Sequence, residues 1–109
     1  AYAYESAGRL TEAITLYEQT LTDRTRILGE DHPNTLTSRN NLAYAYESAG
    51  RLTEAITLYE QTLTDRTRIL SEDHPDTLTS RNNLARVYKD AGFPKKATVL
   101  LEGTTPTEG

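Results

Sequence analysis

The chain has 109 residues, 36% of them hydrophobic, and a formal net charge of −4 at pH 7. Acidic and basic residues are interleaved without a basic stripe, which argues against nucleic acid as a partner. The absence of cysteine excludes disulfides and thiolate metal sites. No apolar run is long enough to span a bilayer and there is no signal-like segment or initiator Met, so we expect a cytoplasmic fragment of a longer protein without a membrane partner.

The chain is a tandem repeat. Residues 1–42 and 43–84 are the same text except at two positions, Gly29 against Ser71 and Asn34 against Asp76, and a third, more divergent copy begins at Ala85. A period of this length indicates supersecondary units that cannot bury their apolar faces alone and stack into a continuous core. Function is therefore expected on a repeated surface rather than in one pocket.

Two breaks in each repeat predict two helices per repeat. In chain order we expect helices at 1–7, 9–29, 33–49, 51–71, 75–91 and 94–102, in one domain over residues 1–102 made of repeats 1–42, 43–84 and a partial 85–102. Residues 103–109 are expected to form a disordered tail. Gly8, Gly50 and Gly92 follow the first helices, where a left-handed residue is needed. Asp31 and Asp73 precede a His-Pro pair, and we predict them to be N-caps.

The second helix of each repeat is amphipathic. Its apolar stripe follows helical spacing and consists of Leu52, Ala55, Ile56, Tyr59, Leu63, Arg66 and Leu70. The first helix carries several alanines, which allow a neighbouring helix to approach closely. The pattern predicts an all-α chain of packed helices.

One segment carries a family resemblance. Residues 40–60 read Asn-Asn-Leu-Ala-x-x-Tyr-x-x-x-Gly-Arg-x-x-Glu-Ala-Ile-x-Leu-Tyr-Glu, and an Asp-His-Pro-x-Thr linker occurs twice. This text resembles the 42-residue tetratricopeptide repeats of kinesin light chains and bacterial signalling ATPases, over residues 1–102. The resemblance implies a right-handed α-solenoid of antiparallel helix pairs. Arg39 and Arg81 depart from it, because many family members have a bulky apolar residue there.

The resemblance also implies a concave groove lined by first helices, with a peptide or protein as ligand. Asn41 and Asn83 match the position at which related repeats hydrogen-bond a peptide, and Asn40 and Asn82 are second candidates. An amide suits this role because it both donates and accepts. In the alternative interpretation, one Asn of each pair bonds to the neighbouring helix. The further candidates on this face are Thr37, Tyr44, Glu47 and Ser48, and Thr79, Arg86, Lys89 and Asp90.

The largest change between repeats on this face is Tyr44 against Arg86. With Lys89 it creates a cationic neighbourhood that suits an acidic or carboxylate-bearing ligand, although sequence drift at a repeat end is an alternative explanation. The family's two-carboxylate clamp is incomplete here, so we do not expect a receptor for chaperone tails.

Nothing in the sequence predicts catalysis. The pairs Asp31-His32 and Asp73-His74 recur once per repeat, whereas a metal or an acid–base site needs further groups that converge. We expect no enzyme activity, metal or cofactor. The leading expectation is an interaction scaffold that binds an extended peptide, and the alternative is a self-associating repeat array.

A final expectation concerns self-association. Ala1 corresponds to Ala43, so the first helix lacks the counterpart of residues 35–42 and leaves the stripe of helix 9–29 partly uncovered. We predict a homo-oligomer through this N-terminal end, either a face-to-face two-fold dimer or a helix exchange.

Overall fold

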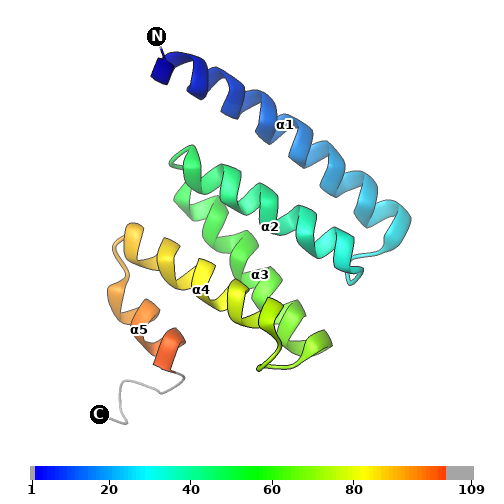
Figure 1. Ribbon diagram of the computed structural model, residues 1–109, viewed down its shortest axis with the longest axis vertical. Helices are drawn as coiled ribbons and strands as arrows, with labels where there is room; N and C mark the ends of the chain where they lie inside the picture. Colours follow the sequence, from blue (N-terminus) through cyan, green and yellow to red (C-terminus); the bar gives the residue numbers. More distant parts are fainter. Residues whose placement is uncertain (1, 103–109) are drawn as a thin grey trace.

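The computed structural model describes the backbone of residues 2–102, and side chains from residue 8 onward. These residues form five helices: α1 (Tyr2–Leu28), α2 (Pro33–Ser48), α3 (Leu52–Leu70), α4 (Pro75–Asp90) and α5 (Pro94–Glu102). Each helix packs against its neighbours in the chain, as the antiparallel path in Figure 1 shows. The predicted all-α solenoid is confirmed. The predicted disorder of residues 103–109 lies outside the described residues.

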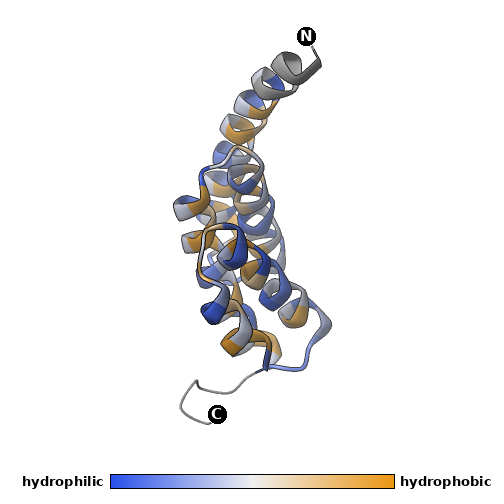
Figure 2. Ribbon diagram, turned by 90° about the vertical axis from the view of Figure 1, so that its left-hand side faces the viewer, coloured by the Kyte–Doolittle hydropathy of each residue, from blue (hydrophilic) through white to orange (hydrophobic). Residues whose placement is uncertain are grey.

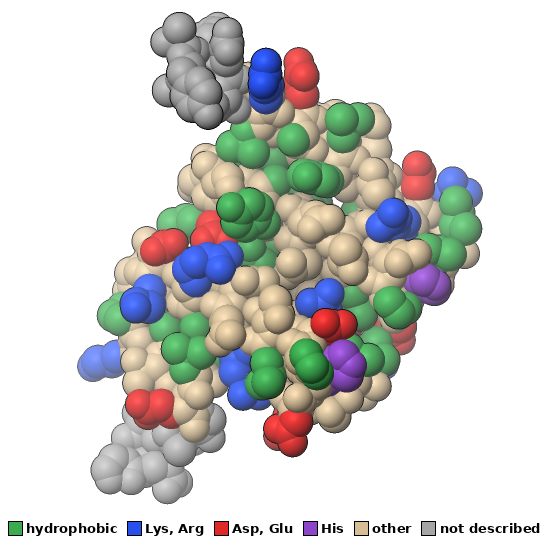
Figure 3. All heavy atoms as spheres, in the orientation of Figure 1, with side chains coloured by type: hydrophobic (Ala, Val, Ile, Leu, Met, Phe, Trp, Pro, Cys, Tyr) green, Lys and Arg blue, Asp and Glu red, His purple; other side chains and the backbone are tan. Residues whose placement is uncertain are grey.

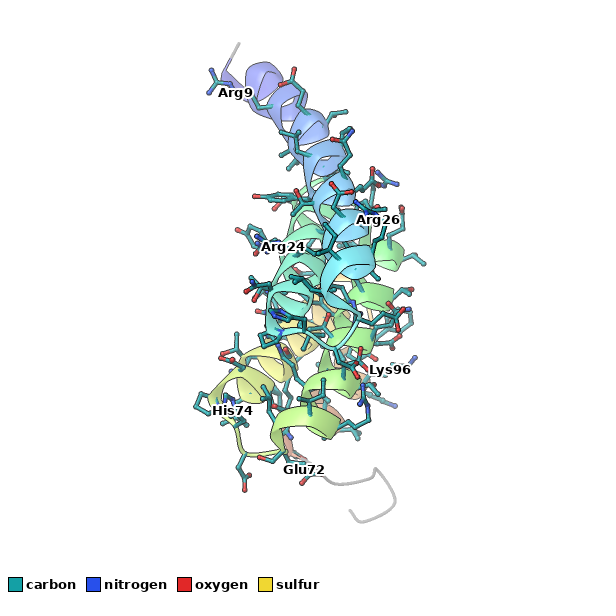
Figure 4. All side chains as sticks on the ribbon, turned by 90° about the vertical axis from the view of Figure 1, so that its right-hand side faces the viewer. Arg9, Arg24, Arg26, Glu72, His74 and Lys96 are labelled. Atoms are coloured by element: carbon teal, nitrogen blue, oxygen red, sulfur yellow. The ribbon has the colours of Figure 1, made fainter. Side chains whose placement is uncertain are left out.

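The helices form two layers. In Figure 4, α2 and α4 lie on one side of the molecule, and α1 and α3 lie on the other. The core lies between the layers, where Ala43, Ala55 and Tyr59 are fully buried. The two alanines allow the helices to approach closely enough for the tyrosine ring to fill the space between them. Hydrophobic stretches alternate with polar ones along every helix (Figure 2), as expected for two-sided elements.

The two interfaces between successive repeats contain the same contacts. Tyr46 donates a hydrogen bond to Glu18 (2.6 Å), and Tyr88 donates one to Glu60 (2.5 Å). An arginine in the preceding second helix donates to a serine in the following first helix in both cases, from Arg24 to Ser38 (2.9 Å) and from Arg66 to Ser80 (2.8 Å). Figure 4 shows Arg24 on the α2 side of α1 and Arg26 on the opposite side. The repeated sequence therefore supplies the same stacking contacts at each interface.

The prediction of two separate helices at 1–7 and 9–29 was wrong. The helix α1 continues through Gly8, whereas the equivalent Gly50 and Gly92 have φ values of 78° and 92° and end their helices as predicted. At Gly50, the turn is held by the buried packing of the whole of α2 against α3. At Gly8, continued helical hydrogen bonding takes the place of the turn.

The predicted N-caps were also wrong by one residue. His32 caps α2, because its Nδ1 accepts a hydrogen bond from the backbone N–H of Asn34 (3.0 Å), and His74 caps α4 by accepting from Asp76 (3.1 Å). Pro at the following position is compatible with this geometry, since it needs no donor. Asp31 instead forms an ion pair with Arg68 of α3 (2.7 Å).

The unusual Arg39 is accommodated by a charge partner. Its side chain is 9% exposed and lies 2.7 Å from the carboxylate of Asp65. An ion pair between α2 and α3 thus takes the place of the bulky apolar residue that the resemblance led us to expect at this position. Arg81, at the same repeat position in α4, is half-buried.

Candidate functional site

One face of the molecule is formed by the first helices α2 and α4, which lie on the side nearest the viewer in Figure 1. We call it the first-helix face. Its exposed side chains recur at helical spacing because the remaining sides of both helices are buried against α1, α3 and α5. They are Thr37, Asn41, Tyr44 and Ser48 of α2, and Thr79, Asn82, Arg86, Lys89 and Asp90 of α4. In Figure 3 the middle of this face carries many uncharged polar groups and a small cluster of basic and acidic side chains.

The four predicted asparagines fall into two groups. Asn83 donates to the side-chain oxygen of Asn40 (3.3 Å) and so links α4 to α2, and it accepts from Arg86 (3.1 Å). Asn41 and Asn82 are exposed, and neither side chain forms a hydrogen bond to another described residue. The structure therefore puts one amide of each pair between the helices and leaves the other on the surface.

Arg86 and Glu47 form the most connected cluster on this face. The guanidinium donates to both carboxylate oxygens of Glu47 (2.9 and 2.8 Å), and the buried Tyr59 of α3 donates to the same carboxylate (3.1 Å). The hydrogen bond from Arg86 is the main reason why the pKa of Glu47 is lowered, and the same bond raises the pKa of Arg86. Burial, followed by the nearby Glu47, raises the pKa of Tyr59. Arg86 is therefore held in place and largely neutralised.

Lys89 is a second cation on this face, and within the described part of the chain its charge is not balanced by an ion pair as that of Arg86 is. It is exposed and forms no ion pair with a described residue. It lines a hollow of about 290 Å³ together with Asn82, Ala85, Arg86, Asp90 and, from α5, Leu101. Four of the predicted candidates, Asn82, Arg86, Lys89 and Asp90, thus come together here. Tyr44, at the repeat position of Arg86, is 59% exposed on α2.

Two residues of the candidate site were not predicted from the sequence. Tyr59 belongs to a second helix and was assigned only to the apolar stripe, yet its hydroxyl reaches the first-helix face through Glu47. Leu101 occupies the repeat position of Tyr59 in the third copy, so a comparison of repeats could have found it. It is 50% exposed and gives the hollow an apolar wall.

Metal binding and membrane insertion find no support in the described part of the chain. Within residues 8–102, no group of three or more His, Asp and Glu side chains could hold a metal ion. None of the described helices combines the length and the apolar character that crossing a membrane requires.

The fold and this surface define a class, an α-helical repeat protein whose exposed polar row suits contact with another molecule. The family model for the tetratricopeptide repeat matches residues 1–67 and 40–102. The chain therefore belongs to the tetratricopeptide repeat family, whose members generally mediate protein–protein interaction through a scaffold that is typically not enzymatic.

Solved structures agree with this assignment. A crystal structure of a kinesin light chain-like protein of Podosopora anserina with nearly identical TPR-like repeats is 36% identical, with a TM-score of 0.81 over 94% of this chain and 48% of that one. The crystal structure of BtubC (BKLC) from P. vanneervenii is 25% identical, with a TM-score of 0.80 over 93% of this chain and 40% of the other. The chain thus spans less than half the length of either protein. A comparison with curated protein sequences gives no significant match.

Proposed function

We propose that the chain is an interaction scaffold that binds an extended segment of a partner protein along the first-helix face. The family's superhelix would make this face the concave groove. The observation that carries the proposal is the row of exposed side chains on α2 and α4. Three pairs in this row are at equivalent repeat positions: Thr37 and Thr79, Tyr44 and Arg86, and Ser48 and Asp90.

The asparagines have different roles in this proposal. Asn41 and Asn82 contact the ligand, because each exposes an unused donor and acceptor that match a peptide N–H and C=O. Asn40 and Asn83 hold the two helices in register through their mutual bond. An amide requires no particular ligand side chain, so it provides affinity for the backbone rather than specificity.

Selectivity comes from the two ends of the row. Tyr44 offers an exposed aromatic ring on α2, which suits an apolar ligand side chain. Lys89 offers a cation beside the hollow, and the adjacent Arg86 keeps the surroundings polar while its charge is balanced by Glu47. The ligand we expect therefore has an apolar residue near Tyr44 and an acidic group near Lys89.

The test uses peptides selected from a random library of extended 12-residue sequences, with affinities measured by titration calorimetry. We expect the double variant Asn41→Ala and Asn82→Ala to weaken binding by about 1–3 kcal/mol, because the peptide groups that they pair would lose their partners. The matched control is Gln19→Ala with Gln61→Ala, which removes two exposed amides from second helices. Equal affinity of both double variants would reject the proposal.

A second arm separates binding from folding. Asn83→Ala should lower the free energy of unfolding, since it breaks the bond to Asn40, whereas the Asn41 and Asn82 changes should leave it unchanged. If all three substitutions destabilised the chain equally, the exposed pair would have no role distinct from that of the bonded pair.

A further inference from the structure

A further hollow lies between α4 and α5, on the side of the molecule away from the first-helix face. Its volume is about 400 Å³, and its lining is mostly apolar apart from two lysines. We call it the lysine-rimmed hollow, and it is lined by Tyr88 of α4 and by Lys95, Lys96, Val99 and Leu100 of α5. In Figure 4, Lys96 lies on the side of α1 and α3 rather than on that of α2 and α4. The hollow is therefore separate from the proposed peptide site.

The next repeat in a stack leaves this side of a second helix open. On α3, the positions that correspond to the two lysines and the valine are Thr53, Glu54 and Thr57. All three are exposed, although α4 and α5 follow α3 in the stack. The exposure of the lysine-rimmed hollow thus follows from the way helix pairs stack, and it does not depend on α5 being the last described helix.

Three of the five lining positions differ from those of the second repeat. The third repeat has Lys95 for Thr53, Lys96 for Glu54 and Val99 for Thr57. Tyr88 and Leu100 keep the residue types of Tyr46 and Leu58. The changes replace two hydroxyls and one carboxylate by two cations and an apolar side chain. The third repeat therefore presents a more apolar and more basic surface at this place than the second.

The corresponding surface of the second repeat is occupied by its own ion pair. Arg51 lies over the ring of Tyr46, 4.5 Å from its centroid, and forms an ion pair with Glu54. In the third repeat Phe93 stands in place of Arg51 and is 45% exposed. The charge that closes this surface in one repeat is thus missing from the next.

The two lysines at the rim are available to a ligand. The Nζ atom of Lys96 lies 5.8 Å from the ring centroid of Tyr88 and 5.0 Å from that of Phe93. These contacts hold the ammonium group in place but leave its N–H donors unused. Lys95 is exposed, and neither lysine forms an ion pair within the described part of the chain. The rim is therefore locally cationic in a chain whose net charge is −4, and carboxylates complement it.

We propose that the lysine-rimmed hollow binds an acidic segment of a partner protein through one large apolar side chain. That side chain packs against Val99 and Leu100, and the carboxylates beside it pair with Lys95 and Lys96. Only two helices form the walls, whereas a site for a free small molecule encloses most of its ligand. A protein segment can add contacts along the outside of α5. Residues 103–109 contain no aromatic or long aliphatic side chain, so they do not supply the apolar group.

The first experiment tests whether both parts of this chemistry are needed. The probe is a fluorescein-labelled peptide with one phenylalanine flanked by two glutamates on each side, and fluorescence anisotropy measures its binding. Alanine in place of the phenylalanine should weaken binding at least about tenfold, because the buried apolar area is lost. Lysines in place of the glutamates should abolish it. No binding of the phenylalanine peptide at about 1 mM, or equal binding of the alanine peptide, would overturn the proposal.

A charge reversal places the peptide on the chain. Lys96→Glu restores the residue that α3 has at this position, and it should weaken binding of the phenylalanine peptide by at least about fivefold. The matched control is Arg9→Glu, which makes the same change of charge at an exposed position of α1. Figure 4 shows Arg9 at the far end of the molecule from Lys96. Equal affinities of the two variants would show that only the net charge matters and would contradict the proposal.

A neutral substitution tests the apolar floor. Val99→Thr introduces the side chain that α3 carries at Thr57, so we expect the helix to form as before, with circular dichroism as the check. It should weaken the phenylalanine peptide by about threefold and leave the alanine peptide unaffected. Full binding by both Lys96→Glu and Val99→Thr would place the peptide elsewhere, including the first-helix face, and would reject this site. Neither residue belongs to the first-helix face, so such a result leaves the proposed function standing.

Discussion

At the residue scale, one of the two sequence differences between the first two repeats lies at a strained backbone position. Gly29 and Ser71 follow the second helices of the first and second repeats, with φ values of 92° and 103°. Ser71 also has ψ of 163°, which places it in a region that only glycine occupies readily. The second repeat therefore carries local strain that the first avoids.

We expect Ser71→Gly to raise the free energy of unfolding by about 1 kcal/mol, because it removes this strain. The reciprocal Gly29→Ser should lower it by a similar amount. Urea denaturation followed by circular dichroism measures both. A stabilising effect of Gly29→Ser would mean that the two linkers do not share the conformation seen here.

At the element scale, helix boundaries depend on what packs beyond them. Gly8 and Gly50 have identical neighbours for seven residues before and twenty after, yet Gly8 lies within α1 whereas Gly50 ends a turn with φ of 78°. A β-carbon would meet no atom within 4 Å at either site, so backbone conformation alone separates their responses to substitution.

The same substitution should therefore change the free energy of unfolding in opposite directions at the two glycines. Gly8→Ala is expected to stabilise the chain by about 0.5–1 kcal/mol through its helix propensity. Gly50→Ala is expected to destabilise it by about 1 kcal/mol or more, because alanine disfavours positive φ. Thermal unfolding compares them. Destabilisation by both would show that Gly8 adopts a turn like that of Gly50 in solution.

At the scale of the whole molecule, the stack is held by an identical contact at each repeat interface. Tyr46 bonds to Glu18 and Tyr88 to Glu60. Burial, reinforced by the hydrogen bond to the carboxylate, raises the pKa of each tyrosine from 10.0 to about 12. Each tyrosine thus binds its proton more tightly in the folded chain than in the unfolded chain, and this stabilises the fold below the unfolded pKa.

This contribution should be fully present below pH 10 and should be lost as the pH rises through about 12. Tyr46→Phe removes one titrating group, so we expect lower stability at neutral pH by about 1 kcal/mol, from the lost hydrogen bond, and a shallower alkaline loss. Unfolding curves at several alkaline pH values measure the slope. Tyr44→Phe, which alters an exposed ring, is the control, and identical slopes for the two variants would contradict the role of Tyr46.

Much of this architecture could be predicted from the sequence, since the signals are local and repeated. The helix periodicity, the positive-φ glycines at Gly50 and Gly92 and the helix pairs that follow residue 33 depend on nearest neighbours in the chain, and the structure confirms them. The caps were misplaced because both Asp31 and His32 have suitable acceptors. Only the partner Arg68, 37 residues away in α3, shows that the carboxylate points elsewhere.

Only the tertiary structure decided whether the copies of a repeated residue have the same burial and the same contacts. Tyr17 and Tyr59 lie in identical 28-residue segments, yet one is exposed and the other buried. Asn40 and Asn41 are adjacent amides, but only one reaches α4. The sequence determined which segments are helical, because local hydrogen bonding and periodicity favour a helix there. It could not determine which faces are covered, because burial depends on helices brought together from distant parts of the chain.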